Sequence, residues 1–463
     1  MKTKGLVLFL LLVFLLTSGL GCGIKNSAPP KTITLKYWRA WDEEDAFNEI
    51  IKKYNSIHPN VKIDYRKFRF DEYEQELLNA LAEDRGPDIF SIPSTWIKGY
   101  QNKIEPLPES LKLTYLELQG SIKKELVQVQ RDDKSLTVRD LRNNFIDQVA
   151  SDVILKITEP KAKTSSEKIF GLPLYVDTLA MFYNKELFNN AGIAEVPTVW
   201  NDKFLQNVKK LTKQNTRGEI IQAGVALGGS TNIERSSDLL SVLMMQNGAV
   251  MINDHNQVSF DAIPKDYENQ RYNPGLEALR FYTDFSSPAK EVYCWNNTLD
   301  NSLKMFEQGR LAIMFGYAYH LPILKAEAPK LNFSVAKLPQ IYNSPRTINF
   351  ANYYVETVSK KSKNINEAWD FIQFATKADQ AKLYLAKTKK PTALRSLIDQ
   401  QLTNQDLSIF ADQVLTAKSW YHGSNVLAAE KIINEMIDQA VAGQASLPDV
   451  IELGARRVQQ TLQ

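Results

Sequence analysis

The sequence predicts an α/β protein with two lobes, and three observations lead to this prediction. The first is a strand–helix–strand alternation over residues 32–92, which is typical of a mostly parallel sheet covered by helices. The second is an apolar, strand-like run over residues 169–183, which we interpret as a crossover from one lobe into the other. The third is the length of 463 residues, which is enough for two domains of ordinary size.

The first 21 residues have the features of a secretory signal. Lys2 and Lys4 give a positive start, and residues 6–16 form an unbroken apolar run that is short for a membrane span. Cys22 follows, and the arrangement resembles a bacterial lipoprotein signal, in which the cysteine is lipid-modified and becomes the first residue of the mature chain. Gly19 and Leu20 depart from that pattern, so plain secretion with a free cysteine is the alternative. Residues 22–31 predict a flexible tether.

The mature chain then alternates strands and helices. Residues 32–38 predict a half-buried strand, and a helix that begins within residues 41–45 presents Phe47, Ile50, Ile51 and Tyr54 on one face. A second strand at 61–65, a second helix and a third strand at 88–92 complete the unit. Ligands of such sheets gather at the carboxyl ends of the strands, where residues 38–42 and 93–96 lie.

Residues 110–168 differ from this unit because they are rich in charged and amide side chains. We expect them to be mainly helical, with one amphipathic face formed by Leu141, Phe145, Ile146, Val149, Val153 and Ile154. Residues 161–168 predict an exposed loop. The C-terminal part predicts helices, the last of which follows residues 446–449.

Charge and cysteine content exclude several classes of protein. Without Lys2 and Lys4 the formal charge falls from +3 to +1, so no basic surface for nucleic acid is indicated. Only Cys294 remains if Cys22 is acylated, so no internal disulfide is expected, and a buried thiol is favoured over a nucleophile. The four histidines (58, 255, 320 and 422) are scattered and predict no zinc site. We expect no metal and no cofactor.

Several segments together resemble the extracellular solute-binding proteins of bacterial ABC importers, the branch that includes maltodextrin-binding proteins. They occur in the family's order and cover nearly the whole mature chain: Gly-Pro-Asp-Ile-Phe (86–90), Lys-Gly-Tyr (98–100), Ile-Glu-Pro-Leu (104–107), residues 170–188, Pro-Thr-Val-Trp (197–200), Gln-Asn-Gly (246–248), residues 306–314 and residues 367–372. Residues 110–168 are longer than the family usually carries at this place, so the resemblance implies nothing about them.

The resemblance implies a two-lobe periplasmic-binding-protein fold with three interlobe crossings and a ligand cleft between the lobes. We expect lobe 1 to contain residues 32–177 plus 355–400, and lobe 2 to contain residues 178–354 plus 401–463. The crossings are expected near 177–179, near 352–356 and within 400–415. The implied function is capture of a carbohydrate, expected to be an oligosaccharide, for delivery to the permease subunits of an ABC transporter. We expect a monomer, exported and lipid-anchored to the cell membrane.

A neutral sugar offers hydroxyl groups and an apolar ring face, so its site needs aromatic side chains for stacking and carboxylates or amides for hydrogen bonds. Asp177 interrupts an apolar run, where an unpaired carboxylate is costly, and it lies where the family places an acidic ligand contact. Trp41 is favoured over Trp38 as a ligand contact, and Asp42 combines that role with an N-cap and a capping box to Asp45. The candidate ligand-binding residues are Trp41, Asp42, Ser94, Thr95, Trp96, Asp177, Tyr317, Tyr319, Trp420 and Tyr421; Glu234, Arg235, Asn352 and Tyr353 are weaker candidates.

Three alternatives stay open at this point. The loop at 92–96 lacks the acidic and basic groups of the maltodextrin branch, so the solute could be a polyol, a sugar phosphate or a polyamine. A sensor subunit that presents the closed lobes to a signalling receptor has the same sequence requirements. An exported glycosidase is disfavoured because four adjacent acids at a helix start cannot flank one glycosidic bond, and no hydrolase motif is present.

Overall fold

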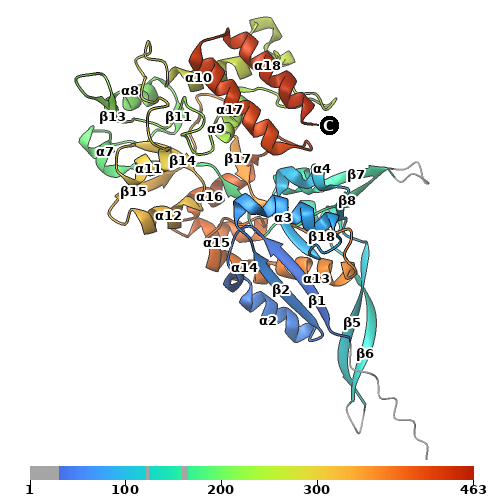
Figure 1. Ribbon diagram of the computed structural model, residues 1–463. Coiled ribbons are helices and arrows are strands. Elements are labelled where there is room, and N and C mark those ends of the chain that lie inside the picture. The colour runs from blue at the N-terminus through green and yellow to red at the C-terminus, as the bar shows by residue number, and fades with distance from the viewer. Residues whose placement is uncertain (1–30, 121–124, 159–164, 463) are drawn as a thin grey trace, which may run out of the picture.

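The computed structural model describes residues 31–120, 125–158 and 165–462, and it has two lobes joined by a narrow hinge (Figure 1). The lobe at the bottom of Figure 1 contains the N-terminal strands, and the upper lobe contains the C-terminal helices. We call them the N-terminal and C-terminal lobes. Within the described residues, no helix combines the length and apolarity needed to cross a bilayer.

The N-terminal lobe is built on a five-stranded sheet with the strand order β2-β1-β3-β18-β4. Only β18 runs against the others, so the prediction of a mostly parallel sheet is confirmed. The strands are β1 Ile33–Arg39, β2 Val61–Lys67, β3 Ile89–Pro93, β4 Ile104–Glu105 and β18 Tyr354–Ser359, and the helices are α2 Asn48–Ile57, α3 Phe70–Ala82, α4 Ile97–Tyr100, α13 Ile365–Ala375 and α14 Ala378–Thr388. The first helix therefore begins later than predicted, after a 3₁₀ turn at Glu44–Ala46.

The segment 110–168 corrects the prediction of a mainly helical region. It contains two antiparallel hairpins, β5 (Ser110–Gln119) with β6 (Glu125–Lys134) and β7 (Ile154–Thr158) with β8 (Ser165–Ile169). Leu111 and Leu113 alternate along β5 and are buried, which is strand periodicity that the charged composition concealed. Of the predicted amphipathic face, Leu141 lies on α5 (Val138–Asn144), and Val149 and Val153 lie on α6 (Asp147–Val153). Phe145 and Ile146 join the two helices, and Ile154 is the first residue of β7. Of the predicted exposed loop, 161–164 lies outside the described residues and 165–168 belongs to β8.

The C-terminal lobe is organised around a three-stranded antiparallel sheet of β14 (Ile313–Gly316), β10 (Ala180–Asn184) and β15 (Phe333–Ala336). Helices surround this sheet: α7 Lys185–Asn190, α8 Asp202–Leu211, α9 Ser236–Asn247, α10 Pro274–Asp284, α11 Ser302–Glu307, α12 His320–Glu327, α17 Val426–Ala442 and α18 Leu447–Gln460. The short pairs β11 (Val199–Trp200) with β16 (Gln340–Ile341) and β12 (Lys213–Gln214) with β13 (Ile220–Gln222) complete it. The predicted last helix is confirmed as α18, whose N-cap Ser446 accepts from the Asp449 N–H.

Three chain segments meet at the hinge in a small sheet with the order β19-β17-β9. Strand β9 (Asp177–Thr178) continues into β10 of the C-terminal lobe, and β17 (Asn349–Asn352) leads into β18 of the N-terminal lobe. Strand β19 (Ala417–Lys418) follows α15 (Ile398–Leu402) and α16 (Ser408–Gln413), and the amide of Gln413 donates to the Thr178 hydroxyl and the Leu179 carbonyl (both 3.1 Å). The signal segment and Cys22 lie outside the described residues.

Candidate functional site

Asp177 lies in the hinge strand β9, and its side chain is almost fully buried. Its Oδ1 accepts hydrogen bonds from the backbone N–H of Thr178 (2.9 Å) and of Ala318 (3.0 Å), which belongs to the turn before α12. Its Oδ2 is equally buried but has no hydrogen-bond partner. Burial raises the pKa of Asp177 to about 7, against the opposing effect of the backbone N–H groups of Ala318, Thr178 and Tyr319 and of Lys390. An acidic group with one unsatisfied oxygen therefore lies where the lobes join.

A second acidic group, Asp42, follows the end of β1 in a left-handed conformation that aspartate tolerates (φ 68°). Its Oδ1 accepts from Lys390 Nζ (2.7 Å), and its Oδ2 accepts from Lys390 (2.9 Å), Tyr384 (2.7 Å) and Arg39 (3.1 Å). Burial acts to raise the pKa of Asp42, but Arg39 and Lys390 outweigh it and lower the pKa. The predicted capping box with Asp45 is wrong, because the carboxylate of Asp42 binds these cations and no side chain caps the helix start.

Arg39 connects this pair to the middle of the N-terminal sheet. Its guanidinium is 3.0 Å from the buried carboxylate of Glu356 on β18, which also accepts from the hydroxyls of Tyr37 (2.7 Å) and Ser91 (3.2 Å). Burial raises the pKa of Glu356, although Arg39 acts to lower it. Four charged side chains form one buried cluster, and each of them is paired with at least one other member: Arg39, Asp42, Glu356 and Lys390. We refer to it as the buried charge cluster.

Trp41 is the exposed aromatic residue of the N-terminal lobe at the end of β1. Its side chain is 43% exposed, and its ring stacks on Phe70, the first residue of α3, with 5.2 Å between ring centroids. The hydroxyl of Tyr65 donates to the carbonyl oxygens of Trp41 (3.3 Å) and Asp42 (2.7 Å) and so fixes the turn. Trp38, by contrast, is buried and packs against Phe68. Of these two tryptophans, Trp41 is therefore the one with surface available to a ligand.

The C-terminal lobe contributes a second aromatic pair. Tyr319 is 37% exposed and stacks on Tyr317, with 5.7 Å between centroids. Tyr317 itself is fully buried, and its hydroxyl donates to Asp238 Oδ2 (2.6 Å), so it presents no surface in this conformation. Burial raises the pKa of Tyr319, while Arg235 acts to lower it and Asp177 to raise it, which places this ring near both charges.

Arg235 lies between these aromatic residues and the hinge. It adopts a left-handed conformation directly before α9 and forms a bidentate ion pair with Asp238 (2.7 and 2.9 Å) and a second pair with Glu430 of α17 (3.2 Å). Burial raises the pKa of Tyr354 on β18 to about 12, while Trp41 and Arg235 act to lower it and Glu430 to raise it, so these side chains lie close to Tyr354. Residues of the two lobes therefore approach one another around Arg235 and Tyr354. The weaker candidate Glu234 accepts from Asn301 (3.0 Å), and its charge acts to raise the pKa of Tyr319.

The other predicted site residues are mostly buried. Ser94, Thr95 and Trp96 form a 3₁₀ turn after β3, with Trp96 at 8% exposure and stacked on Tyr100. Trp420 is 9% exposed and packs edge-on against Tyr421, whose hydroxyl contacts the Thr461 carbonyl (2.8 Å). These residues therefore present little surface to a ligand in this conformation.

The remaining candidates, Asn352 and Tyr353, lie in and just after β17. The hydroxyl of Tyr353 donates to Asp152 of α6 (2.5 Å), and Asp152 also accepts from Ser419 and Gln148. This network connects the insertion 110–168 to two of the three hinge segments. It is a structural role for Tyr353 that the sequence did not indicate.

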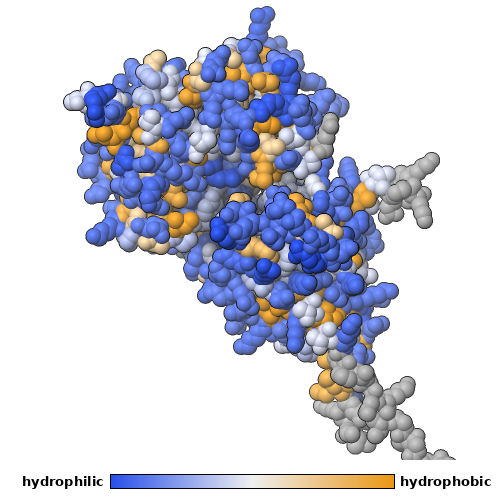
Figure 2. Space-filling view, viewed as in Figure 1, coloured by the Kyte–Doolittle hydropathy of each residue, from blue (hydrophilic) through white to orange (hydrophobic). Residues whose placement is uncertain are grey.

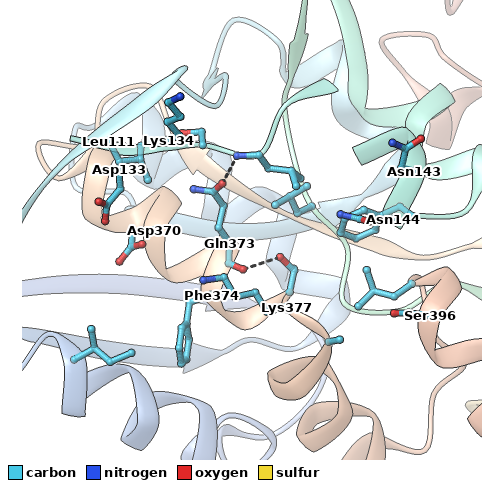
Figure 3. Close-up of a pocket in the computed structure, with 18 of the residues that line it drawn as sticks. Leu111, Asp133, Lys134, Asn143, Asn144, Asp370, Gln373, Phe374, Lys377 and Ser396 are labelled. Carbon is cyan, nitrogen blue, oxygen red and sulfur yellow. Dashed lines mark hydrogen bonds between the residues drawn. The ribbon is translucent and has the colours of Figure 1, made fainter. Parts of the chain in front are cut away.

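A separate cavity of about 970 Å³ opens within the N-terminal lobe, away from the hinge (Figure 3). The base of the β5–β6 hairpin, the end of α13 and the segment 394–396 surround it, with Leu111, Lys134, Gln373 and Asn144 among its walls. The buried hydroxyl of Ser135 in this wall has no partner. None of the residues predicted to bind ligand lines this cavity.

The sequence missed the partners that decide what each candidate can do. Four such partners lie far along the chain from the candidate residues that they contact, and no local pattern indicated them. They are Phe70, Lys390, Tyr354 and Glu430. Across the described parts of the chain, no group of three or more histidine, cysteine or acidic side chains could hold a metal ion. Cys294 is buried and burial raises its pKa to about 12, so the prediction of a buried thiol is confirmed.

Comparison with known proteins gives one family. The sequence pattern of the bacterial extracellular solute-binding proteins matches residues 40–382, and the chain therefore belongs to this family. It is 20% identical over 382 residues to the galactooligosaccharide-binding protein of Bacillus subtilis, covering 81% of this chain and 77% of that one. It is 23% identical over 234 residues, about half of each chain, to the maltooligosaccharide ABC transporter solute-binding lipoprotein of Streptococcus pneumoniae.

Solved structures share the fold. A cyclo/maltodextrin-binding protein complexed with maltotetraose aligns with a TM-score of 0.68 at 14% identity, covering 94% of this chain and 99% of that one. The two-lobe fold expected from the resemblance is confirmed, and the family and fold are those of binding proteins. Figure 2 shows the upper and lower lobes as two masses of surface that meet near the middle of the view.

Proposed function

We propose that this chain is the substrate-binding lipoprotein of an ABC importer, and that it captures a carbohydrate, expected to be an oligosaccharide, between its lobes. The observation that carries the proposal is the arrangement at the hinge. Trp41 and Tyr319 are exposed aromatic rings from opposite lobes, and Asp177 offers a buried carboxylate oxygen without a partner. Rings that stack on sugar faces and a carboxylate that accepts from a hydroxyl are the two groups such a ligand needs.

Membership of the family supports a binding function, and the sugar-binding names of the relatives support the class of ligand.

The cations near the hinge support a neutral ligand over a phosphate, because Arg235 and Lys390 are already paired with carboxylates. A polyamine would need several free carboxylates, and those of Asp42, Asp238 and Glu430 are likewise engaged. Asp177 Oδ2 is shielded from solvent here, so a ligand reaches it only through movement of the lobes.

Lipid attachment at Cys22 and delivery to a permease complete the proposal. The relative from Streptococcus pneumoniae, which is a lipoprotein by name, supports the anchor. A sensor role would use the same closed form, and neighbouring genes for two permease subunits would distinguish transport from sensing.

The proposal is tested by a thermal-shift screen. A ligand that binds only the folded state raises its stability by about 2.7 kcal/mol at a concentration of 100 Kd, which shifts the melting temperature of this chain by a few degrees. We expect neutral oligosaccharides, such as malto- and galactooligosaccharides, to produce this shift. Polyamines and sugar phosphates serve as comparison ligands. A shift with these and with no neutral sugar would overturn the carbohydrate assignment, and turnover of the glycan would overturn the binding function.

A further inference from the structure

The β5–β6 hairpin extends from the N-terminal lobe, away from the C-terminal lobe (Figure 1). Its strands pair in register over ten positions, from Ser110 with Lys134 at the base to Gln119 with Glu125 at the far end. The inner face is buried at the base, where Leu111 and Leu113 belong to the hydrophobic core. Beyond this base the ribbon is held by its own cross-strand contacts, such as Tyr115 with Asp133 and Arg131 with Glu117, and by the packing of Tyr115 on His58.

The outer face of the hairpin changes from charged to apolar along its length. The cross-strand pair at the base is Lys112 with Asp132, followed by Thr114 with Gln130, then Leu116 with Gln128, and finally Leu118 with Leu126. Leu118 is 65% exposed and Leu126 is 52% exposed. Among the described residues of this face, the ionised side chains are confined to the base. Figure 2 shows hydrophobic surface at this lower end of the molecule.

Such a gradient matches the profile of a membrane surface, which passes from water through polar headgroups to hydrocarbon. Isolated exposed leucines are common on soluble proteins and need no explanation. Here, however, the two most exposed leucines of the described residues are direct cross-strand partners, one position before the last pair of a projecting ribbon (Gln119 with Glu125), and the half-buried Leu116 lies behind them on the same face.

The N-terminal chain leaves the fold beside this hairpin. Ile33, the first residue of β1, donates its N–H to the carbonyl of Asn60 (2.9 Å), and the neighbouring His58 packs its ring on Tyr115 of β5 at 4.9 Å. Leu118 lies three residues beyond Tyr115, about 10 Å further along the strand. Cys22 precedes Ile33 by eleven residues, which span at most about 40 Å. The anchor can therefore reach a surface at the level of Leu118.

We propose that the far end of the β5–β6 hairpin, with Leu118 and Leu126, rests in the interface of the lipid bilayer that holds the Cys22 anchor. This inference rests on the lipid anchor of the proposed function. Two leucines are too small a surface for a stable protein–protein interface, which needs about 800 Å² from each partner. They suffice for a tethered contact, because a short tether gives an effective concentration in the millimolar range. The contact would fix the orientation of the lobes above the membrane.

The test attaches the chain from Cys22 onward to vesicles of phosphatidylcholine that contain a maleimide-headgroup lipid. Cys294 does not compete for the maleimide, because it is buried and burial raises its pKa to about 12. Hydrogen–deuterium exchange of the peptides over 112–119 and 126–131 is compared between attached and free protein. We expect exchange in these peptides to slow about tenfold or more on attachment, since each buried leucine is worth about a tenfold change in partitioning.

Substitutions then separate a hairpin contact from a general effect of attachment. The double variant Leu118→Asp, Leu126→Asp is expected to lose the protection, and Leu118→Ala, Leu126→Ala to lose part of it while keeping the strand pairing. Leu427→Asp is the matched control, because Leu427 is equally exposed (50%) but lies on α17 of the other lobe. Protection that is absent, or that survives both hairpin variants, overturns the proposal.

Two further measurements separate the membrane contact from self-association and from the sugar site. Protection of the same peptides in concentrated protein without vesicles would assign the surface to a second copy of the chain and overturn the membrane contact. The sugar-induced thermal shift is recorded for every variant and should be unchanged. If the hairpin contacts the bilayer but no sugar shifts the melting temperature, the proposed sugar binding has failed. If sugars shift the melting temperature but the hairpin is not protected, the proposed membrane contact has failed.

Discussion

Asp177 is buried and Asp42 is half-buried near the junction of the lobes, and they differ in how their oxygens are used. Asp42 accepts from Lys390, Arg39 and Tyr384, so each of its oxygens has a partner. Asp177 accepts only backbone N–H groups at one oxygen, and the other oxygen has none. The carboxylate of Asp42 is therefore compensated by cations, whereas the carboxylate of Asp177 keeps one oxygen without a hydrogen-bond partner.

The difference separates a structural role from a binding role. A buried carboxylate with full compensation stabilises the surrounding fold, and its removal leaves cations unpaired. A buried carboxylate with a free oxygen costs stability unless something completes it, and a ligand hydroxyl is a suitable donor. We therefore expect Asp42 to control mainly stability and Asp177 mainly ligand binding. The first two of the four predictions that follow test this division, and the other two test the aromatic residues proposed to bind the ligand together with Asp177.

The largest expected effect is that of Asp42→Ala on stability. The substitution leaves Lys390 buried without its carboxylate partner, whereas Arg39 keeps Glu356, and breaking a buried pair in this way costs about 3–5 kcal/mol. Urea unfolding followed by tryptophan fluorescence should show a large fall in the midpoint. Asp45→Ala is the control, because Asp45 pairs with Lys387 on the surface, and such pairs contribute less than about 1 kcal/mol. Similar midpoints for the two variants would contradict the structural role of Asp42.

The second prediction concerns pH and Asp177. Its folded-state pKa of about 7 lies above the ordinary value of 3.8, so the folded protein binds this proton more tightly than the unfolded chain does. The resulting stabilisation is fully present below pH 3.8 and is lost as the pH rises through about 7. Asp177→Asn is neutral at every pH and should be more stable than the wild type at pH 8 by about 4 kcal/mol, with almost no difference at pH 4.

Urea midpoints of both proteins at pH 4 and pH 8, without ligand, measure this effect. Asp254→Asn, at an exposed aspartate, should keep the pH profile of the wild type. The same Asp177→Asn protein should bind sugar more weakly at pH 8, because an amide accepts a hydroxyl less strongly than a carboxylate does. A variant that gains no stability at pH 8 and loses no affinity would assign Asp177 a purely structural role.

The third prediction compares the aromatic residues of the two lobes. Tyr319→Ala and Trp41→Ala should each lower sugar affinity about tenfold to a hundredfold, because each removes a stacking surface of about 1.5–3 kcal/mol. Isothermal titration with the best sugar from the thermal-shift screen measures this loss. Tyr342→Ala is the matched control, since Tyr342 is an exposed tyrosine on the same lobe as Tyr319 and lies outside the site. Unchanged affinity in both site variants would remove the aromatic part of the site.

The sequence predicted the features that depend on local periodicity. The strand–helix–strand start, the buried face of Leu141 to Val153 and the presence of a last helix near residues 446–449 follow from the spacing of apolar and polar residues. It failed where a partner lies far along the chain. The β5–β6 hairpin has charged residues on its outer face that resemble a solvated helix until the cross-strand partners are known.

The same limit applied to the site. The position of Asp42 after β1 was predictable, but its partner Lys390 is 348 residues away, and nothing near residue 42 indicates it. Asp177 was recognisable because a lone acid in an apolar run needs compensation. Whether that compensation is complete depends on backbone groups of residue 318, which only the folded structure brings to it.

The smallest expected effect concerns Phe70, a residue of the site that the sequence did not indicate. Its ring is 53% exposed and stacks on Trp41, so it supports one face of that indole and does not replace it as a ligand contact. Phe70→Ala should lower sugar affinity only about threefold to tenfold, in line with about 0.5–1.5 kcal/mol for an aromatic pair. A double-mutant cycle with Trp41→Ala decides how it acts. If Phe70 acts by holding Trp41 in place, its substitution does not lower sugar affinity further once Trp41 is alanine. If the two losses of affinity add, Phe70 contacts the ligand independently and the aromatic surface of the N-terminal lobe is larger.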